Sequence, residues 1–428
     1  MLNINLKTAL TLCEINKFEK PFFSNESSVI LFHFDGTKQN LATYLHLMLE
    51  TKHILILNPL NRKKYTNTFH GVINYEFIFG LEGSFKNTNT KNINTFKASL
   101  IDKDVRLVIP TSGTTADPKL FCFSTKKLTL AAKNISDSLF LSKNDTALGY
   151  LPTNYTYGLS VLHSHLYVKS KFLLPEYGQH LLACFKNDLF SHIYCVPSSL
   201  NSIKKYAYKF LNNKSLKMLC QAGGPLSNSE AKFWFNICKK NKVEFVRMYG
   251  QTECGPRISC LRSIDFLNNP ETVGKPINGV EVFLNKKTSE LLVDSTTLAD
   301  GYLKYQDNEW FIKSLESPYK TGDIGKINKD GYISIDGRAS RFAKIQDMRI
   351  SLDEIEFIAE EIALTDIGVI ESKGKIAIIP SNTVSEDLIK KISKKLNLPA
   401  RNFILLSPSF FSLNGNNKKN YKLMESNL

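Results

Sequence analysis

The N-terminal quarter of the chain alternates short apolar segments with a segment of helical periodicity. Residues 28–34 and 54–57 are apolar runs of strand length, and residues 40–50 between them repeat apolar side chains at helical spacing. A strand, a helix and a second strand in this order predict a parallel α/β unit, because parallel strands need a crossover connection. Further strand-like segments follow at residues 107–110, 146–151, 172–174, 192–196, 218–221 and 245–248.

The pattern changes at about Thr272. Short strands broken by turn sequences follow, for example residues 328–331 and 334–337. The last part alternates helix and strand over residues 352–428, which is typical of a small α+β domain. We therefore expect a large N-terminal α/β domain of parallel and mixed sheets with flanking helices (residues 1–335), a hinge at Asp336, and a small mobile C-terminal domain (residues 337–428).

Composition excludes several classes of protein. The chain of 428 residues is 43% hydrophobic and 22% charged, which is ordinary for a globular protein. Its eight cysteines form no CxxC pair, so a zinc cage or a disulfide framework is not expected. Its apolar stretch at residues 6–12 is interrupted by Lys7, and no apolar run approaches the ~20 residues that cross a bilayer. We expect a cytoplasmic protein with no membrane span.

The net charge of +15 leaves polyanionic partners open, among them phosphate-rich cofactors and acidic proteins. The basic residues are mostly lysines spread along the chain, without an arginine-rich helix or an RNA-binding aromatic signature. We therefore expect no nucleic-acid partner. A solvated basic surface with no specific partner explains the charge equally well.

One loop has the composition of a phosphate site. It follows an apolar strand directly and contains small and hydroxyl residues, namely Thr111, Ser112, Gly113, Thr114 and Thr115, with Lys119 after them. Such a loop lets backbone N–H groups approach phosphate oxygens, and the lysine adds positive charge. Its spacing is not that of a Walker loop, and a polar turn is the alternative interpretation.

A second cluster is Tyr249-Gly250-Gln251-Thr252-Glu253, again after an apolar strand. The tyrosine ring can stack on a base, and the carboxylate can hold a magnesium ion that bridges phosphates. A buried strand end with a solvated turn remains the alternative. Taken one at a time, Asp323, Arg338 and the lysines of residues 414–419 are better explained by ordinary solvated turns and a basic tail.

Together and in this order, these motifs resemble the adenylate-forming superfamily, which comprises acyl-CoA synthetases, aryl-CoA ligases and the adenylation domains of peptide synthetases. The resemblance covers about residues 28–423. It implies ATP and Mg²⁺ as cofactors and activation of a small carboxylic acid as an acyl-adenylate, with release of pyrophosphate. Transfer to the thiol of CoA, or to the phosphopantetheine of an acidic carrier protein, follows in this family.

The resemblance also implies roles for individual residues. The loop of Thr111, Ser112, Gly113, Thr114, Thr115 and Lys119 matches the segment that folds over the ATP phosphates. Gly223, Gly224 and Pro225 match the segment beside adenine, Tyr249 the ring that stacks on it, and Gly250 the turn glycine that follows. Thr252 matches a phosphate contact, Glu253 the magnesium ligand, and Asp323 with Arg338 the ribose contacts. Lys418 matches the lysine that reaches the α-phosphate and the attacking carboxylate, so the implied catalytic residues are Lys418, Glu253 and Thr252.

A pocket for the acid is implied next to the nucleotide, lined by Tyr155, Tyr157, Cys195, Gly224 and Cys254. An amino-acid-activating member normally carries an aspartate in the gate segment that corresponds to residues 151–159 here. Because no aspartate lies between Tyr150 and His165, we favour an uncharged acyl or aryl acid over an α-amino acid.

Three positions depart from the family pattern. Ala116 and Asp347 stand where glycine is usual, and Asn417 replaces the glycine before the C-terminal lysine, so that Lys419 is an alternative to Lys418. Two other functions therefore stay open: an amino-acid-adenylating ligase, and a degenerate member that binds nucleotide or acyl groups without turnover.

Overall fold

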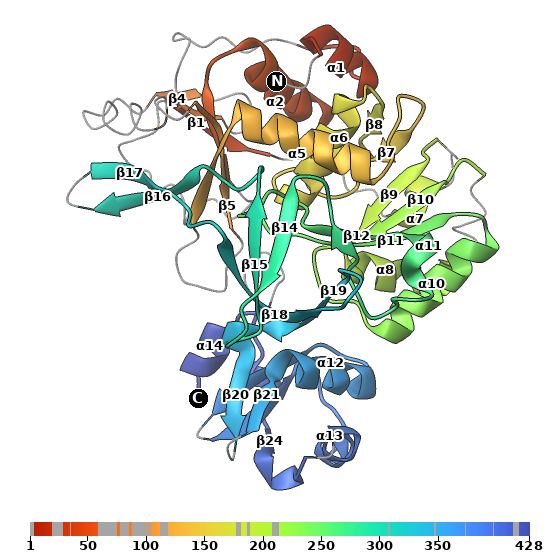
Figure 1. The fold of residues 1–428 in the computed structure, drawn as a ribbon, viewed down its shortest axis with the longest axis vertical. Helices are drawn as coiled ribbons and strands as arrows, with labels where there is room; N and C mark the ends of the chain where they lie inside the picture. Colours follow the sequence, from red (N-terminus) through yellow and green to blue (C-terminus); the bar gives the residue numbers. More distant parts are fainter. Residues whose placement is uncertain are drawn as a thin grey trace.

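The computed structural model describes residues 4–18, 29–34, 36–58, 75–77, 85–87, 100, 104–111, 119–176, 181–185, 189–207, 214–306, 309–345, 348–372, 374–396, 398–413 and 419–428. The described chain forms a large N-terminal domain and a small C-terminal domain, which lies at the lower end of the molecule in Figure 1. The expected α/β architecture, with a small α+β domain at the C-terminus, is therefore confirmed.

The first sheet has eight strands in the order β17-β16-β6-β5-β2-β1-β3-β4. The pairs β1/β2, β1/β3 and β2/β5 are parallel, and the remaining pairs are antiparallel. All five residues of β1 are buried, as expected of a strand covered on both faces. The strands are β1 Val29–His33, β2 Ile54–Asn58, β3 Tyr75–Phe77, β4 Phe85–Asn87, β5 Val105–Pro110, β6 Leu120–Ser124, β16 Gly301–Gln306 and β17 Glu309–Lys313.

The second sheet has seven strands in the order β13-β12-β11-β10-β9-β7-β8, and its strands β7 to β11 are parallel. The apolar runs at residues 192–196, 218–221 and 245–248 are confirmed as its central strands. The strand expected at residues 146–151 is shorter and ends at Leu148. The strands are β7 Thr146–Leu148, β8 Lys171–Leu173, β9 His192–Cys195, β10 Met218–Gln221, β11 Glu244–Tyr249, β12 Ser259–Leu261 and β13 Lys275–Pro276.

Helices α5 and α6 lie between these two sheets (Figure 1). The main hydrophobic core contains residues of both helices together with Phe32 of β1, Ile109 of β5 and Met248 of β11. A second core lies on the other face of the seven-stranded sheet, around the fully buried Trp234 of α10. The helices of the large domain are α1 Leu6–Leu12, α2 Lys38–Glu50, α5 Thr125–Ser138, α6 Thr156–Tyr167, α7 Leu181–Cys184, α8 Pro197–Ile203, α10 Asn228–Lys240 and α11 Ser263–Phe266.

A third, antiparallel sheet completes the large domain, with strands β14 Val280–Leu284, β15 Glu290–Ser295, β18 Tyr319–Ile327 and β19 Ile333–Arg338. The turn expected at residues 328–331 joins β18 to β19. The prediction of a turn at residues 334–337 is wrong, because these residues belong to β19. Gly337, with φ of +140°, sits at an irregularity of the ladder where the pairing register shifts between Ile324 and Gly325.

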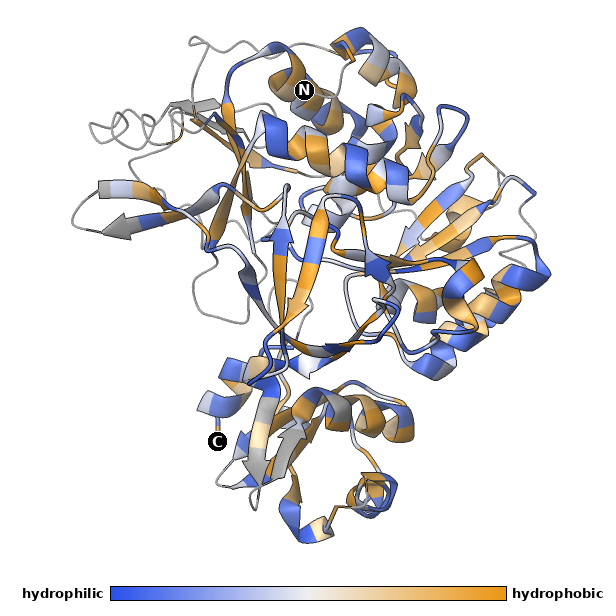
Figure 2. Cartoon of the chain, in the orientation of Figure 1, coloured by the Kyte–Doolittle hydropathy of each residue, from blue (hydrophilic) through white to orange (hydrophobic). Residues whose placement is uncertain are grey.

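The small domain has its own apolar core, which includes Ile355, Val369 and Ile378. Its elements are β20 Phe342–Ile345, β21 Met348–Ser351, α12 Leu352–Ala363, β22 Ile367–Ser372, β23 Lys375–Pro380, α13 Leu388–Leu396, β24 Phe403–Leu405 and α14 Tyr421–Ser426. Colouring by hydropathy shows apolar residues along the sheet interiors and hydrophilic residues on the outer faces of the helices (Figure 2).

Two expectations about composition can be checked here. None of the eight cysteines, all within the described ranges, forms a disulfide. Among the described residues, every helix is too short or too polar to cross a membrane.

Candidate active site

The carboxyl ends of β9, β10 and β11 lie side by side, because Gln221 of β10 is in register with both Cys195 of β9 and Arg247 of β11. The segments that leave these ends contain Pro197, Gly223 to Pro225, and Gly250 to Cys254. In open parallel sheets this edge is where ligands bind. The fold therefore gathers three of the motifs singled out in the sequence.

Asp323 is the centre of a polar cluster at this edge. Its Oδ2 accepts hydrogen bonds from the Tyr249 hydroxyl and from the Gln251 amide, while its Oδ1 lies 2.8 Å from Nε of Arg338. Arg338 also donates from Nη1 to the carbonyl oxygen of Thr321 at 3.2 Å. The Asp323 side chain is 6% exposed and that of Arg338 is 53% exposed, so the guanidinium forms the solvent side of the cluster. Burial raises the pKa of the Asp323 carboxyl, and Arg338 opposes this.

Tyr249 and Asp323 were both expected to face a nucleoside, and they contact each other. Gln251 was not among the expected site residues, although it lies inside the motif. Its amide also donates to the carbonyl oxygen of Thr321 at 3.0 Å, so it ties the loop after β11 to strand β18.

Glu253 is half-buried on the same loop. Burial raises the pKa of its carboxyl, and the nearby Arg338 and Lys119 oppose this. Its backbone carbonyl oxygen accepts a hydrogen bond from the N–H of Ala299 at 3.0 Å. This contact ties the loop to the segment that follows β15 of the third sheet. The carboxylate is therefore partly desolvated and lies near two cations and the Asp323 carboxylate.

The same loop is fixed at two further points. The hydroxyl of Thr252 lies 2.7 Å from that of Thr156 at the start of α6. A Cβ on Gly250 would lie 2.2 Å from the carbonyl oxygen of Pro256, so the loop folds back on this residue and only glycine fits.

The phosphate-loop motif is described at its two ends. The N–H of Thr111 donates to the carbonyl oxygen of Lys119 at 2.9 Å, which closes the loop between β5 and β6. The Lys119 ammonium lies 5.3 Å from the ring centroid of Tyr302. Ser112, Gly113, Thr114, Thr115 and Ala116 lie outside the described residues, as does Asp347.

The segment expected beside adenine packs against the expected acid pocket. Gly223 has φ of +81°, and a Cβ there would lie 3.1 Å from Val196 and 3.5 Å from the Tyr157 ring. The carbonyl oxygen of Gly224 accepts from Nε2 of Gln221 at 3.0 Å. Pro225 continues this segment and is exposed.

Four of the five expected pocket residues lie in segments that meet at this edge. Tyr155 is the residue before α6, Tyr157 lies in its first turn, Gly224 follows β10, and Cys254 is buried in the main core.

Cys195 is the exception. Its side chain belongs to the second core with Leu219 and Trp234, whereas its neighbour Tyr194 packs edge-on against Tyr157. Since successive side chains of a strand point to opposite faces, the thiol lies on the far face of the sheet and does not join the wall formed by Tyr157.

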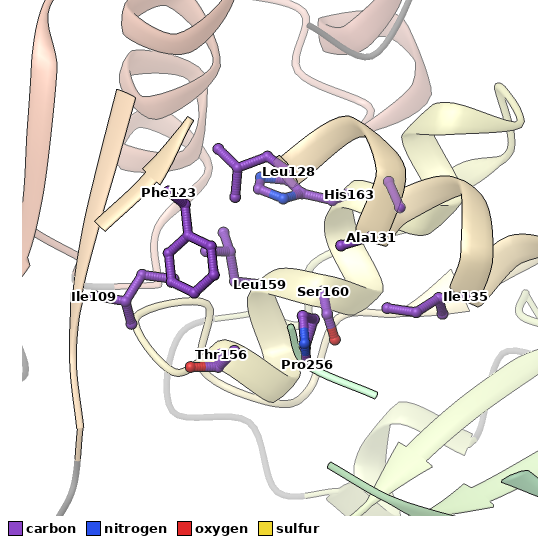
Figure 3. A pocket seen from close by; sticks show the side chains of 11 residues that line it. Ile109, Phe123, Leu128, Ala131, Ile135, Thr156, Leu159, Ser160, His163 and Pro256 are labelled. Atoms are coloured by element: carbon purple, nitrogen blue, oxygen red, sulfur yellow. The ribbon is translucent and has the colours of Figure 1, made fainter. Parts of the chain in front are cut away.

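A small apolar cavity lies next to the gate segment (Figure 3). Side chains of α5, of α6, including Thr156 and Ser160, and of strands β5 and β6 form its wall together with Pro256. Gly158 sits where the chain enters α6, and a Cβ there would lie 2.3 Å from the carbonyl oxygen of Pro152. This close approach sets the path of the gate segment.

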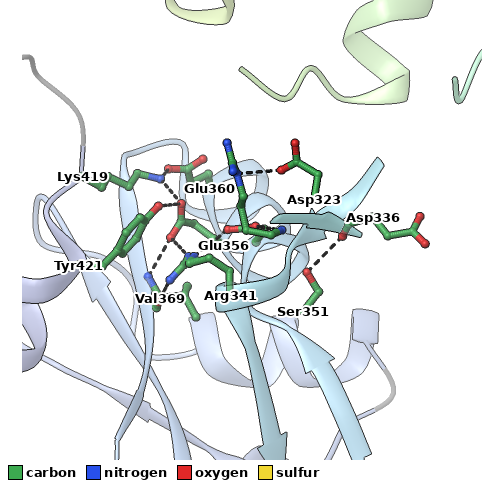
Figure 4. Close-up of polar contacts among 11 residues, drawn as sticks. Asp323, Asp336, Arg341, Ser351, Glu356, Glu360, Val369, Lys419 and Tyr421 are labelled. Carbon is green, nitrogen blue, oxygen red and sulfur yellow. Dashed lines mark hydrogen bonds and ion pairs between the residues drawn. The ribbon is translucent and has the colours of Figure 1, made fainter. Parts of the chain in front are cut away.

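The expected C-terminal lysine, Lys418, lies outside the described residues, and so does Asn417. Lys419 is described and is held within the small domain (Figure 4). Its ammonium pairs with Glu356, at 2.7 Å, and with Glu360, and its side chain is 18% exposed. Glu356 also accepts from the Tyr421 hydroxyl and from Nη2 of Arg341, both at 2.7–2.8 Å. Lys419 is thus part of a structural ion network.

Comparison with known proteins shows the family to which this chain belongs. Residues 49–303 match the family model described as AMP-binding enzyme, which is more than half of the chain. The chain therefore belongs to the family of AMP-binding enzymes.

Two curated relatives illustrate the range of the family. The 2-succinylbenzoate–CoA ligase of Lactococcus lactis is 23% identical over 374 residues, covering 80% of this chain and 79% of that protein. Surfactin synthase subunit 2 of Bacillus subtilis is 24% identical over 364 residues, covering 77% of this chain. The chain spans only 10% of that subunit.

Among solved structures, the o-succinylbenzoate coenzyme A synthetase of Bacillus subtilis in complex with ATP and magnesium ion has the same fold. The two structures compare with a TM-score of 0.70 at 16% sequence identity, and the comparison covers 98% of this chain and 92% of the other.

Proposed function

We propose that this chain activates a carboxylic acid with ATP to an acyl-adenylate and then transfers the acyl group to a thiol, as an AMP-forming acid–thiol ligase. The observation that carries the proposal is the cluster of Tyr249, Asp323 and Arg338 beside Glu253 and Lys119. A diol acceptor, an aromatic ring, a carboxylate and a cation, contributed by the three sheets of the large domain, fit a nucleoside with its phosphates and a metal ion.

In this proposal each part of ATP has its own contacts. Asp323 accepts from the ribose hydroxyls and Arg338 donates to the ribose, while the Tyr249 ring stacks on adenine with Gly223, Gly224 and Pro225 beside it. Thr111, Lys119 and the loop of Ser112, Gly113, Thr114 and Thr115 hold the phosphates, with Thr252 as a further contact.

Glu253 fits the proposed magnesium site. Mg²⁺ in nucleotide enzymes is held by one or two carboxylates together with phosphate oxygens, and Glu253 supplies one carboxylate among the described residues of this edge. When bound, the ion neutralises charge that develops on the phosphates.

In the adenylation step, a carboxylate oxygen of the acid attacks the α-phosphorus, and the bond to the pyrophosphate oxygen breaks. We assign Lys418 to the charge on the attacking carboxylate and the α-phosphate. The pairing of Lys419 with Glu356 and Glu360 supports this choice between the two lysines, since Lys419 already has two anionic partners.

We further propose that the small domain (residues 337–428) rotates against the large one (residues 1–335) about Asp336 between the two steps. Asp336 lies in β19, and its carboxylate pairs with Lys326 at 3.2 Å on the surface, a contact that such a rotation can exchange with water.

For the acceptor we favour CoA, because the relative from Lactococcus lactis is named as a CoA ligase and aligns over four fifths of this chain. The phosphopantetheine of an acidic carrier protein is the other acceptor. The net charge of +15 suits either anionic partner.

The test is acid-dependent conversion of ATP and Mg²⁺ to AMP and pyrophosphate over a panel of acyl, aryl and amino acids, with CoA present or absent. We expect pyrophosphate only with an acid, and AMP release to rise with CoA. Formation of ADP and phosphate would exclude the proposal, and nucleotide binding without turnover would favour a non-catalytic binding protein.

A second candidate is adenylation of an amino acid, which the match to surfactin synthase subunit 2 favours. The gate segment, residues 151–159, speaks against it, because it contains no aspartate or glutamate to pair with an α-amine. Turnover of α-amino acids in the same panel would establish it.

A further inference from the structure

The edge of the seven-stranded sheet opposite the candidate active site is formed by the segments that lead into its parallel strands. These segments are hydrogen-bonded to one another in series. The N–H of Ser191 donates to the carbonyl oxygen of Thr146 at 2.9 Å, and the N–H of Lys217 donates to that of Ser191 at 2.8 Å. The N–H of Glu244 donates to the carbonyl oxygen of Lys217 at 2.7 Å, and the Glu244 carboxylate pairs with Arg262, just before α11. We call this surface the amino edge, and it comprises residues 140–145, 189–191, 214–217, 242–244 and 262–267.

Large apolar side chains stand out from the amino edge. Phe140, Ile264 and Leu267 are 73%, 85% and 63% exposed. The guanidinium carbon of Arg262 lies 4.2 Å from the ring centroid of Phe140, and Ile264 and Leu267 follow Arg262 closely in the chain, so these side chains belong to one region. Leu189, just before β9, is 63% exposed on the same edge. Single exposed apolar residues are ordinary, but several along one edge indicate a surface that contacts another apolar phase.

The backbone of Phe140 adds a second observation. Phe140 follows Leu139, the C-cap of α5, and has φ of +52°, in the left-handed region that glycine usually occupies at this position. A bulky side chain is uncommon there, because its Cβ crowds the backbone. Glycine would end the helix without this strain and without an exposed ring. A contact of the ring outside the chain accounts for its presence.

Lysines surround these apolar side chains. Lys143, Lys214 and Lys242 lie in the segments before β7, β10 and β11, and all three are exposed. None of the three forms an ion pair with another described residue. The last turn of α10 adds Lys239 and Lys240, also exposed, directly before this edge. The amino edge therefore carries positive charge that the chain does not neutralise.

The carboxylates of the amino edge are largely neutralised within the chain. Asp145 is buried and pairs with Lys217 at 2.9 Å, while Glu244 pairs with Arg262. Asp265 of α11, which is half-buried, is the remaining described carboxylate in these segments. An anionic partner is thus attracted by the unpaired lysines and repelled by little.

We propose that the amino edge docks the protein on the surface of an anionic lipid bilayer, with Phe140, Ile264 and Leu267 inserted among the lipid headgroups. Side chains this exposed stand above their surroundings, which suits insertion into a fluid interface better than close packing against a folded partner. The unpaired lysines supply charge without fixed geometry, which fits a layer of lipid phosphates, whereas a defined anionic site favours arginine. The proposal does not rest on the ligase function. It leaves the opposite edge of the sheet, which carries the candidate active site, facing away from the bilayer.

The experiment is sedimentation of the full chain with vesicles of phosphatidylcholine alone, or of phosphatidylcholine with about one third phosphatidylglycerol. We expect binding to the anionic vesicles to be at least about tenfold stronger, and to weaken about tenfold or more when the salt concentration rises from about 0.05 M to about 0.5 M. Phe140→Ser combined with Ile264→Ser should weaken this binding about tenfold or more, because two apolar side chains no longer insert. Lys143→Gln combined with Lys242→Gln should weaken it about tenfold as well.

Matched controls come from the small domain. Leu364→Ser removes a side chain that is 90% exposed there, and Lys390→Gln with Lys394→Gln removes two exposed lysines of α13. Both controls should bind the anionic vesicles like the wild type. Because all of these side chains are exposed, the melting temperatures should stay close to that of the wild type, which verifies that each variant is folded. If the variant with both serines in the large domain does not fold, the variant that lacks Lys143 and Lys242 decides.

Equal binding to neutral and anionic vesicles, or unchanged binding after loss of Phe140 and Ile264, would overturn the proposal. So would a loss of the same size in the Leu364→Ser control, since binding would then not depend on the amino edge. Binding to poly-L-glutamate that requires Lys143 and Lys242, without binding to vesicles, would overturn it in favour of an acidic protein partner. All of these measurements are made without ATP or acid, so a failure of the ligase proposal does not affect them.

Discussion

Replacing Lys419 by alanine removes the cation that two glutamates of α12 share. Glu356 keeps three partners, namely Arg341, the Tyr421 hydroxyl and the N–H of Val369. Glu360 keeps only the N–H of Ile367 among the described groups, at 3.1 Å. The cost therefore falls mainly on Glu360, a carboxylate whose side chain is 30% exposed.

The magnitude follows from this geometry. Breaking a buried ion pair costs about 3–5 kcal/mol, and partial exposure of both Lys419 and Glu360 reduces this to about 2 kcal/mol. In a domain of fewer than 100 residues, 1 kcal/mol corresponds to about 4–8 °C in Tm. We expect the C-terminal domain of Lys419→Ala to melt about 8–16 °C lower if it unfolds as its own unit, as followed by scanning calorimetry.

The neighbouring lysine should behave in the opposite way. Lys418→Ala should leave Tm within about 2 °C and lower acid-dependent pyrophosphate release about a hundredfold, which corresponds to about 3 kcal/mol of transition-state stabilisation. Lys391→Ala is the control, because Lys391 of α13 pairs with Asp387, just before the helix, on the exposed surface, and its loss should leave Tm unchanged. A Lys419→Ala variant that melts like the wild type and loses pyrophosphate release would refute the assignment of the two lysines.

Three further predictions concern the large domain. Glu253→Gln should raise the Mg²⁺ concentration needed for half-maximal pyrophosphate release about tenfold or more, and an unchanged Mg²⁺ titration would contradict its role as a metal ligand. Gly158→Ala should lower the free energy of unfolding in urea by about 2 kcal/mol, because its Cβ would lie 2.3 Å from the carbonyl oxygen of Pro152; a wild-type denaturation midpoint would show that the gate segment can relax. Burial lowers the pKa of His163 and His192 to about 4 and that of His165 to about 3. Below about pH 6.5 the unfolded chain binds protons on these histidines, whereas the folded chain does not until lower pH. The free energy of unfolding is therefore highest above pH 6.5 and falls as the pH approaches 4, by about 3 kcal/mol each for His163 and His192. Urea midpoints measured from pH 7 to pH 4 test this, and a flat profile would be inconsistent with neutral buried imidazoles.

The sequence was sufficient where local pattern decides the structure. Apolar runs of four to six residues predicted the central strands of both large sheets, because strands buried on both faces leave no polar position. Placing motifs directly after such strands also predicted that the segments around Gly224 and Tyr249 would meet at one edge.

The sequence was insufficient where a side chain's surroundings decide its role. Cys195 was expected in the acid pocket, yet the alternation of β9 turns its thiol to the other face of the sheet. The burial of Arg257 and its lack of a counter-ion among the described residues also could not be predicted, because the sequence shows only a basic residue. The one available signal was its place as a lone cation between Cys254 and Leu261.

Arg338 connects the nucleotide cluster to the small domain through two different parts of one residue. Its side chain pairs with Asp323, while its backbone N–H donates to Oδ2 of Asp353 on α12 at 3.0 Å. Asp353 also accepts a hydrogen bond from Nε of Arg341 at 2.8 Å. A Cβ on Gly337 would lie only 3.0 Å from Oγ of Ser351, so the chain is closely packed at this point. A rotation of the small domain about Asp336 must therefore change the backbone contact of the same residue that is proposed to bind the ribose. We therefore propose that occupancy of the ribose site is coupled to the orientation of the small domain through Arg338, so that nucleotide binding favours the orientation with the higher nucleotide affinity.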